Sequence, residues 1–248
     1  MDRLIYTAMT AMNAAMDRQR VVANNLANAS TTGFRQEIFA VTPATLKDGS
    51  LEARAPARGN VRGADMTAGR VVPTGNAMDV ALEGKALLAF QSPDRQGEVY
   101  SRRGDLRVAA SGVIENGEGL AVLGEGGSPI TVPPGFSIAI AADGTIMARD
   151  PASPTAPAEA IDKLRLVNPE GSPLAKGIDT FLKVPGGGVL PPDPTARLAP
   201  GALEMSNVET ADTLVQMIEA QRAFEQRAKI IATAGDLDEA SSSLMTLR

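Results

Sequence analysis

Apolar residues near the N-terminus recur at alternating steps of four and three positions. Between Leu4 and Asn28 no Gly or Pro interrupts the chain, so the backbone can form one continuous helix. This spacing is a heptad repeat, which predicts a helix whose apolar seam packs against another helix. The seam positions are Ile5, Met9, Met12, Met16, Gln19, Ala23 and Leu26, and a parallel stripe contains Ala8, Ala15 and Val22.

The C-terminal end of the chain carries a matching pattern. Ser206 and Glu209 have the spacing of a capping box, in which each side chain accepts a hydrogen bond from the other residue's backbone amide. We therefore expect a C-terminal helix over residues 206–248 that pairs with the N-terminal helix as a coiled coil on assembly. Its seam positions are Leu214, Met217, Gln221, Phe224, Ala228 and Ile231, flanked by Val215, Ile218 and Ala232.

Between the two helices the apolar period changes to two, and Gly, Pro, Asn or Asp separates the short apolar runs. This pattern predicts a mainly β central domain, a turn-rich irregular sheet or barrel, flanked by the α-helices. Asp143 and Gly144 predict a tight two-residue hairpin turn, for which they would supply the positive φ angles. The expected strands are residues 80–82, 86–90, 99–101, 106–108, 113–114, 120–123, 130–132, 137–140, 164–167 and 181–184.

Three stretches are typical of connections. Residues 41–76 are too long for an ordinary loop inside a compact domain, so we expect an extended arm between the N-terminal helix and the β-domain. Residues 150–160 and 186–205 are rich in Pro or Gly, which favours stiff loops or disorder. The expected division is an N-terminal helical segment (1–40), the arm (41–76), the central β-domain (77–185), the Pro/Gly-rich connection (186–205) and the C-terminal helix (206–248).

Both terminal helices are tethered by long connections, and an isolated helix is marginal in water. We therefore expect them to form stably only by packing on each other and on neighbouring copies of the chain. The seam residues Met9, Met12, Met16 and Leu26 are then either an interface between subunits or the core face of a docked helix.

Three asparagines lie near the end of the predicted N-terminal helix, although Asn favours caps and turns over helix interiors. Asn24, Asn25 and Asn28 mark either fraying of the helix end or amides that fix the register of an assembly. A buried polar residue has the second role in coiled coils.

Composition excludes most familiar enzyme chemistry. The 248 residues contain no Cys, no His and no Trp. These gaps exclude disulfides, thiol nucleophiles, zinc sites built from thiolate or imidazole, and Ser/His/Asp triads. A net charge of −5 and an aromatic share of 3% lack the basic, stacking surface of nucleic-acid binding. We expect no cofactor, no metal, no nucleic acid and no small-molecule substrate.

Asp79, Glu83 and Asp105 could form the carboxylate pair of a glycan-hydrolysing enzyme. Each lies beside a glycine turn, and no apolar setting that would raise a carboxyl pKa can be argued for them. A secreted enzyme that modifies cell-wall glycan is therefore a minor alternative. A binding module that scaffolds another assembly without polymerising is a further one.

The chain contains no run of about 18 apolar residues, which argues against a transmembrane helix. Its first residues mix charged and polar side chains with apolar ones, unlike the basic and then continuously apolar stretch of a cleaved signal peptide. We therefore expect that, if the protein leaves the cytoplasm, it uses another route.

Three parts of the sequence carry a specific resemblance. Near the N-terminus it is ANNLANASTTGFR, at residues 23–35. Near the C-terminus it is LEMSNV, followed by residues 217–225 and 229–231, and in the middle it is residues 75–84 and 100–106. These stretches resemble the signatures of the axial proteins of the bacterial flagellum, the rod and hook proteins.

The resemblance implies a structural subunit of the flagellar basal-body rod that assembles helically with other rod proteins and transmits torque across the periplasm. The opening residues and the length are most similar to proximal rod members, and a distal rod subunit is the alternative. The implied partners are copies of the chain itself, other rod proteins and the flagellar type III export apparatus. The implied location is the rod in the periplasmic space, reached with an uncleaved export signal in residues 1–40.

Assembly is expected to use residues of both helices and both terminal signatures. These are Ile5, Met9, Met12, Met16, Asn24, Asn25, Leu26, Asn28, Gly33, Phe34, Ser206, Asn207, Val208, Leu214, Met217, Ile218, Phe224 and Ile231.

Overall fold

The computed structural model describes residues 2–43, 57–94, 97–153, 157–177 and 179–246. The chain divides into two compact units, each built from segments that are distant in sequence. The helical unit consists of Met1–Ala27, Glu37–Gly63 and Glu209–Arg248, and the β unit of Asn28–Gln36 and Ala64–Val208. The described chain is therefore mainly β with a helix near each end, which confirms that part of the predicted fold class.

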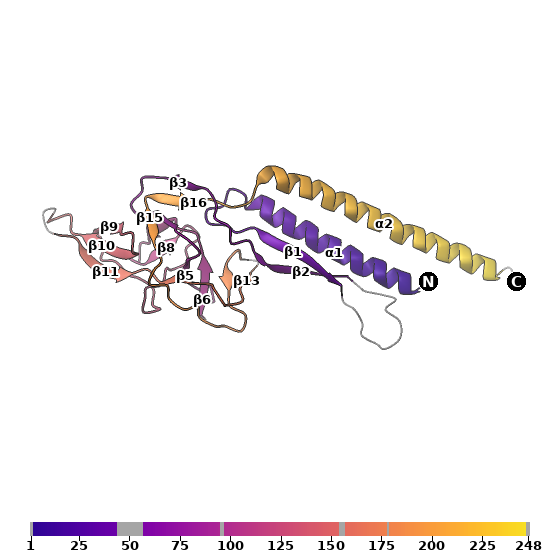
Figure 1. Cartoon of the computed structure of the whole chain (residues 1–248), viewed down its shortest axis with the longest axis horizontal. Coiled ribbons are helices and arrows are strands. Elements are labelled where there is room, and N and C mark those ends of the chain that lie inside the picture. The colour runs from indigo at the N-terminus through magenta and orange to yellow at the C-terminus, as the bar shows by residue number, and fades with distance from the viewer. Residues whose placement is uncertain (1, 44–56, 95–96, 154–156, 178, 247–248) are drawn as a thin grey trace. The chain divides into compact units, whose positions relative to one another are not determined.

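The helical unit contains two antiparallel helices that lie side by side, α1 (Asp2–Ala27) and α2 (Thr210–Thr246) (Figure 1). Strand β1 (Glu37–Pro43) packs beside α1 and pairs with β2 (Ala57–Ala64). Helix α1 ends where Asn28 begins a turn, in which the Asn28 carbonyl accepts a hydrogen bond from the Thr31 amide at 3.1 Å. The Gly-free and Pro-free stretch of the sequence thus forms the expected single helix.

The pairing of β1 with β2 differs from the extended arm expected over residues 41–76. Strand β3 (Val71–Pro73), in the same range, pairs with β16 (Ala202–Glu204). The sequence pattern did not reveal β2 because its residues, ARGNVRGA, show no alternation of apolar and polar side chains. Residues 44–56 of the expected arm lie outside the described residues.

Helix α2 begins at Thr210, after the position that the capping box predicted. The Ser206 hydroxyl accepts a hydrogen bond from the Val208 amide at 3.2 Å. The Glu209 carbonyl instead accepts the Thr213 amide at 3.0 Å, so Glu209 is the residue that precedes the helix. Before the helix, the Met205 amide donates to the Arg70 carbonyl and the Asn207 backbone amide donates to the Phe34 carbonyl, so this segment is bonded into the β unit.

The β unit is made of short strands in small antiparallel sheets (Figure 1). Besides β3 and β16, the strands are β4 (Val80–Leu82), β5 (Leu87–Gln91), β6 (Glu98–Ser101), β7 (Leu106–Val108), β8 (Ile114–Asn116), β9 (Ser137–Ile140), β10 (Thr145–Arg149), β11 (Glu159–Lys163), β12 (Leu166–Val167), β13 (Ala175–Lys176), β14 (Leu182–Lys183) and β15 (Leu198–Pro200). The sheet orders are β12-β5-β6-β14-β13 and β11-β10-β9, with the pairs β15-β4, β16-β3 and β7-β8. Among the described strands no sheet closes on itself, so the irregular sheet forms rather than the barrel.

One hydrophobic core connects most of these small sheets. It contains Leu88 and Phe90 from β5, Ile114 from β8, Ile146 from β10 and Leu198 from β15. Strands this short cannot bury an apolar face alone, so the shared core makes each sheet depend on the others.

The expected connection over residues 186–205 contains two strands. Strand β15 pairs with β4 and β16 pairs with β3, and Leu190 and Leu198 are buried. Likewise, β11 begins at Glu159, inside the expected connection over residues 150–160. Proline and glycine at the ends of these short strands concealed them in the sequence pattern. The compact β unit therefore extends beyond the expected bounds of 77–185.

The predicted two-residue hairpin turn at Asp143 and Gly144 is wrong in detail. Only Gly144 of this pair has a positive φ, of 87°. The loop is closed by the Ala141 amide, which donates a hydrogen bond to the Thr145 carbonyl at 2.9 Å. Asp143 contributes through its side chain, which accepts the Thr145 amide at 3.0 Å.

Tyr100 ties the Leu190 segment to strand β6 inside the β unit. Its hydroxyl accepts a hydrogen bond from the Leu190 amide at 2.9 Å and donates one to Glu98 Oε2 at 3.0 Å. Burial raises the pKa of Tyr100 to about 12, because the phenolate would lose its hydration and would face the Glu98 carboxylate.

The raised pKa of Tyr100 predicts a loss of stability at high pH. The folded state holds the phenol proton more tightly than the unfolded state, so this contribution is complete below pH 10 and disappears as the pH rises through about 12. In the Tyr6→Phe variant Tyr100 is the only tyrosine left. Titration of its phenolate absorbance should give a midpoint near pH 12. A midpoint near the ordinary value of 10 in folded protein would contradict the burial argument, and Tyr100→Phe is the control.

Candidate functional site

The carboxylate of Glu204, at the end of β16, is fully buried in the β unit. Its Oε1 accepts hydrogen bonds from Arg35 Nη2 at 2.6 Å and from the Gly69 amide at 2.7 Å. Its Oε2 accepts one from Arg102 Nε at 2.6 Å. We call these four residues the Glu204 clasp. It joins chain segments that are 102 and 169 positions away from Glu204.

The two guanidinium groups of the clasp are satisfied to different degrees. Arg102 also donates to the carbonyls of Gly84 and Ala86, at 2.8 and 2.9 Å, and to that of Leu82. Arg35 makes only the bond to Glu204 through its side chain, and its Nε and Nη1 atoms are buried without a partner among the described residues. Burial lowers the pKa of Arg35, and the Glu204 carboxylate opposes this effect. One carboxylate thus balances two buried cations.

Glycines permit the close approach of the clasped segments. The Gly33 amide donates to the Glu204 carbonyl at 2.7 Å, and Gly33 has a φ of +67°. A Cβ atom at Gly33 would overlap the backbone of Arg102 and Arg103. Only glycine therefore fits this position without displacement of its neighbours.

The Asn207 amide fastens the same region a few residues further along. Its Oδ1 accepts a hydrogen bond from the Gln36 amide at 2.7 Å. Its Nδ2 donates to the carbonyls of Asp65 and Thr67, at 2.9 and 3.1 Å. One side chain thus bridges three segments of the β unit.

In α1 the face that is buried within the chain is not the predicted heptad seam. The buried side chains are those of Ala14, Ala15, Val21 and Val22, in line with the narrower alanine and valine stripe. On the seam, Met9 and Met16 are 54% and 51% exposed, and Met12 and Leu26 are half-buried. The Ile5 side chain lies outside the described part. One apolar row of α1 is thus covered and a second is open.

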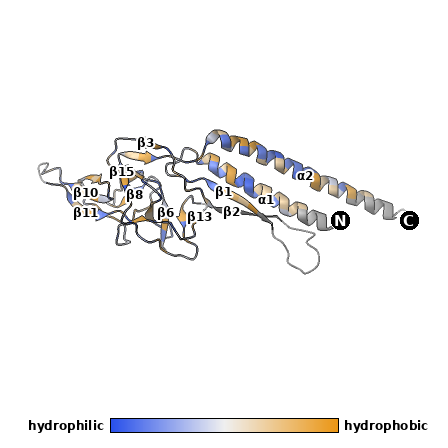
Figure 2. Cartoon of the chain, viewed as in Figure 1, coloured by the Kyte–Doolittle hydropathy of each residue, from blue (hydrophilic) through white to orange (hydrophobic). Residues whose placement is uncertain are grey.

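In α2, apolar and polar residues are interspersed along the helix (Figure 2). The seam residues Met217, Phe224 and Ile231 are half-buried, and Ala220 between them is buried. Exposed apolar residues cover the other side, namely Leu214, Val215, Ile218, Ile230 and Leu237, each at 48–58% exposure. A helix with apolar residues all round is typical of one buried on every side.

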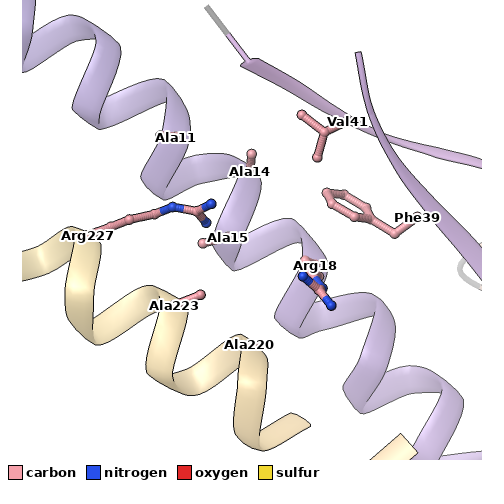
Figure 3. A pocket seen from close by; sticks show the side chains of 9 residues that line it. All are labelled: Ala11, Ala14, Ala15, Arg18, Phe39, Val41, Ala220, Ala223 and Arg227. Carbon is pink, nitrogen blue, oxygen red and sulfur yellow. The ribbon is translucent and has the colours of Figure 1, made fainter. Parts of the chain in front are cut away.

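Small side chains line a hollow of about 90 Å³ where α1, α2 and β1 meet (Figure 3). Ala11, Ala14 and Ala15 come from α1, and Ala220 and Ala223 come from α2. Phe39 and Val41 of β1 cover one side, and Arg18 and Arg227 complete the lining. Five of the nine lining residues are thus alanines, which leaves the hollow between the helices unfilled.

The three asparagines have partners within the chain. Asn25 is 2% exposed, and its amide bonds the Glu37 backbone twice, with Nδ2 donating to the carbonyl at 3.0 Å and Oδ1 accepting the amide at 2.8 Å. Asn24 Nδ2 donates to Glu37 Oε1 at 2.7 Å. Asn28 Oδ1 accepts the Thr31 hydroxyl at 3.1 Å. Asn25 therefore fixes the start of β1 against the end of α1.

The remaining predicted interface residues lie close to the Glu204 clasp. Phe34 and Gly33 are buried, and the Lys176 ammonium lies 3.3 Å from the centre of the Phe34 ring. Val208 is buried, and Ser206 is half-buried. These residues shape the β unit and offer little surface to a partner.

Sequence reasoning missed Arg35, Arg102 and Glu204. All three lie inside the stretches on which the resemblance was based, yet none was given a role. A signal was present for Glu204, since it stands between Leu203 and Met205 and shares the buried side of β16 with Ala202. A charged residue at a buried strand position requires a partner.

Of the three acidic residues considered for catalysis, two are bonded to neighbouring side chains and the third is exposed to solvent. Asp79 accepts hydrogen bonds from the Thr74 hydroxyl at 2.6 Å and from Asn76 Nδ2 at 3.0 Å. Asp105 is held by Arg103 through two bonds of 2.7 and 2.8 Å. Glu83 is exposed. Among the described residues no group of three or more acidic side chains is arranged to hold a metal ion.

No helix within the described residues combines the length and the apolar character needed to cross a membrane.

Comparison with known sequences links the three clasped regions to one group of proteins. The family described as "Flagella basal body rod protein" matches residues 5–35, and "Flagellar hook protein FlgE/F/G D1 domain" matches residues 81–148. "Flagellar basal body rod FlgEFG protein C-terminal" matches residues 199–244. Arg35, Arg102 and Glu204 fall in the first, second and third of these matches.

Full-length relatives agree with these matches. The chain is 37% identical over 253 residues to the flagellar basal-body rod protein FlgF of Salmonella typhimurium, and 38% identical to that of Escherichia coli. Both alignments cover 100% of each chain. It is 28% identical to the flagellar basal-body rod protein FlgG of Bacillus subtilis, over 99% of each chain.

Neutralising the Glu204 carboxylate should destabilise the β unit severely. Glu204→Gln keeps the shape of the side chain but leaves the Arg35 and Arg102 cations uncompensated in the interior. We expect a loss of about 3–5 kcal/mol in the free energy of unfolding, measured by urea denaturation. The control is Glu170→Gln, which removes an exposed carboxylate paired with Lys85 and should change little. Equal effects of the two substitutions would refute the role of the clasp.

The close packing at Gly33 can be separated from its backbone conformation. Gly33 and Gly75 have similar φ values, +67° and +76°, but a Cβ at Gly75 would meet no atom within 4 Å. Gly75→Ala should cost about 1–2 kcal/mol for the left-handed conformation alone. Gly33→Ala should cost about 1–3 kcal/mol more, because Cβ overlaps the Arg102–Arg103 backbone. Urea unfolding measures both, and equal costs would show that the segments are not tightly packed.

Proposed function

The chain belongs to the family of flagellar basal-body rod proteins, and we propose that it is a proximal-rod subunit whose terminal helices pack against neighbouring subunits in a helical tube. The members of this family are structural rod proteins, so the chain is a structural subunit and not an enzyme. The proximal position is supported by full-length similarity to FlgF, which exceeds the similarity to the FlgG relative.

The observation that carries the assembly proposal is the exposed apolar surface on both helices. Within one chain, Met9 and Met16 of α1 and Leu214 and Ile218 of α2 remain about half exposed. Exposed apolar surface of this kind marks interaction sites, since its burial against a partner is favourable. Subunits that bind one another through different faces form an open, helical assembly when the rotation from one subunit to the next does not close into a ring.

We assign the predicted interface residues two roles. The row of Met9, Met12, Met16 and Leu26, which Ile5 extends, and the α2 residues Leu214, Met217, Ile218, Phe224 and Ile231 contact neighbours and pair as a coiled coil in the assembly. The others act within the chain. Asn24 and Asn25 hold the start of β1 against α1. The rest contribute to the β unit, namely Asn28, Gly33, Phe34, Ser206, Asn207 and Val208.

We further propose that the chain is delivered by the flagellar type III export apparatus, with an uncleaved export and assembly signal in residues 1–40. The rod that the chain helps to build lies in the periplasmic space and transmits torque. Its partners are copies of itself and other rod proteins. These proposals are supported by the membership of the chain in the rod-protein family.

The location can be tested on isolated basal bodies. A tag inserted after Gly187, in an exposed glycine-rich turn of the β unit, should be labelled on the rod at its proximal end. Label at the distal end would identify a distal-rod subunit, and label outside the rod would refute the proposed function.

Charges on the exposed helix rows should weaken assembly without weakening the fold. Met16→Asp and Ile218→Asp each place a carboxylate that is hydrated in the monomer but must be desolvated in the assembly. We expect at least about a tenfold rise in the critical concentration for polymerisation, which corresponds to 1.4 kcal/mol, and an unchanged melting temperature. Sedimentation at increasing protein concentration gives the first quantity.

The matched control is Val189→Asp, which changes an exposed apolar residue of the β unit, at 58% exposure, instead of one on a helix. Its critical concentration should equal that of the native chain. If the helix variants polymerise like this control, the helices are not the assembly surface.

A further inference from the structure

The hollow in the helical unit combines an apolar bottom with a charged rim (Figure 3). Ala15 of α1 and Ala220 of α2 line it and are 2% and 1% exposed, so they form its bottom. Arg18 and Arg227, one from each helix, also line it. The Arg18 side chain is 44% exposed, so the rim reaches the surface of the helical unit. An apolar group with an acidic group beside it would match both parts of the hollow.

The positive charge at this rim has little compensation within the chain. Arg227 is half-buried and forms no ion pair with any residue that the structure describes. Arg18 Nη2 lies 3.7 Å from Glu219 Oε2, and both side chains are exposed. Exposed pairs of this kind contribute little. Both guanidinium groups can therefore still bind a carboxylate from outside the chain.

The hollow has the size for one aliphatic side chain. Its volume is about 90 Å³, and an engineered apolar cavity of about 150 Å³ holds a benzene molecule. Alanines of both helices would contact such a side chain, and Phe39 and Val41 would cover it from one side. The hollow is thus better suited to a leucine than to an aromatic ring.

A matching surface lies near the end of α2. Leu237 is 58% exposed, more than any other large apolar side chain that is described on the two helices. Asp236 precedes it and is exposed. Residues 230–247 contain three acidic residues and no Lys or Arg, so this end of α2 is acidic. It therefore presents an exposed leucine in an acidic setting.

Leu237 cannot reach the hollow of its own chain. It lies ten residues beyond Arg227 in the same helix, which is about 15 Å along the helix axis. Helix α2 has 37 residues and α1 has 26, so α2 is longer by about 16 Å. Figure 1 shows the C-terminal end of α2 extending past α1. Only another copy of the chain can bring its Leu237 to this hollow.

We propose that the end of α2 around Leu237 docks into the hollow of a neighbouring copy, with Leu237 against the alanines and Asp236 beside Arg227. The inference rests on the proposed function and deepens it by naming two surfaces that meet. The hollow and the end of α2 are different surfaces, so the contact is heterologous and can be repeated from copy to copy.

A disulfide between copies tests this contact directly. The chain has no cysteine, so Ala223→Cys in the lining of the hollow and Leu237→Cys introduce the only thiols. Within one chain these positions are about 21 Å apart along α2. A disulfide requires Cα atoms within about 7 Å, so any bridge must join two copies.

We expect the double variant, oxidised as polymer, to form a ladder of dimers and larger multimers on a non-reducing gel. The matched control combines Ala223→Cys with Ile230→Cys. Ile230 is 55% exposed on the same helix but follows Lys229 instead of an aspartate. It lies about 10 Å along the helix from Ala223, so it also cannot bridge within the chain. This control should give little ladder.

Charge reversal tests the same contact without a change at Leu237. Arg227→Glu and Asp236→Arg should each raise the critical concentration for polymerisation about tenfold. The two together should return it close to the native value, because the pair is restored with opposite signs. Arg149→Glu, at an exposed arginine of the β unit, should not rescue Asp236→Arg. A merely structural Arg227 would not be rescued by Asp236→Arg, about 14 Å away along its own helix.

The inference is overturned if native chain polymerises but the Leu237 pair gives no more ladder than the Ile230 pair. It is also overturned if the double reversal fails to restore polymerisation, which decides the matter where cysteine at 237 prevents assembly. In both cases the proposed function survives, since polymer still forms. If the native chain stays monomeric at every concentration in sedimentation, the proposed function fails together with this inference.

Discussion

The Glu204 carboxylate has two oxygen atoms, and the architecture of the β unit depends on what they accept. Oε1 accepts from Arg35 and Gly69, and Oε2 accepts from Arg102, all within 2.7 Å. A buried ion pair contributes little net stability compared with apolar packing, but it penalises every arrangement in which one partner is missing. The Glu204 clasp therefore mainly specifies the fold of the β unit, since only one arrangement of three distant segments satisfies the buried charges.

This constraint explains why the family signatures are spread along the chain. Arg35 follows α1, Arg102 follows β6 and Glu204 ends β16, so each signature brings one charged side chain to the same point. The mixed apolar surface of α2 and the open Met9 and Met16 row of α1 then remain available to partners.

Local patterns in the sequence predicted both helices and most strands, because each depends on residues a few positions apart. They failed where pairing is long-range. Strands β15 and β16 lie in a Pro-rich and Gly-rich stretch, and they form because β4 and β3, far away in sequence, supply their partners. The heptad seam of α1 was identified as apolar, yet periodicity could not tell that the narrower Ala15 and Val22 stripe would be the covered one. The clasp was invisible for the same reason, since Arg35 lies 169 positions from Glu204.

The most direct test of this account is a double-mutant cycle between Arg35 and Glu204, measured by urea unfolding of Arg35→Met, Glu204→Leu and the double variant. Glu204→Leu and the double variant both lose the bond from Arg102 to Glu204, so this loss cancels in the cycle. If the carboxylate selects the fold by compensating buried charge, the two substitutions should be coupled by about 2–3 kcal/mol, with the double variant less damaged than the sum of the single ones. Additivity within about 0.5 kcal/mol would contradict the account, because it would mean that Arg35 and Glu204 do not depend on each other.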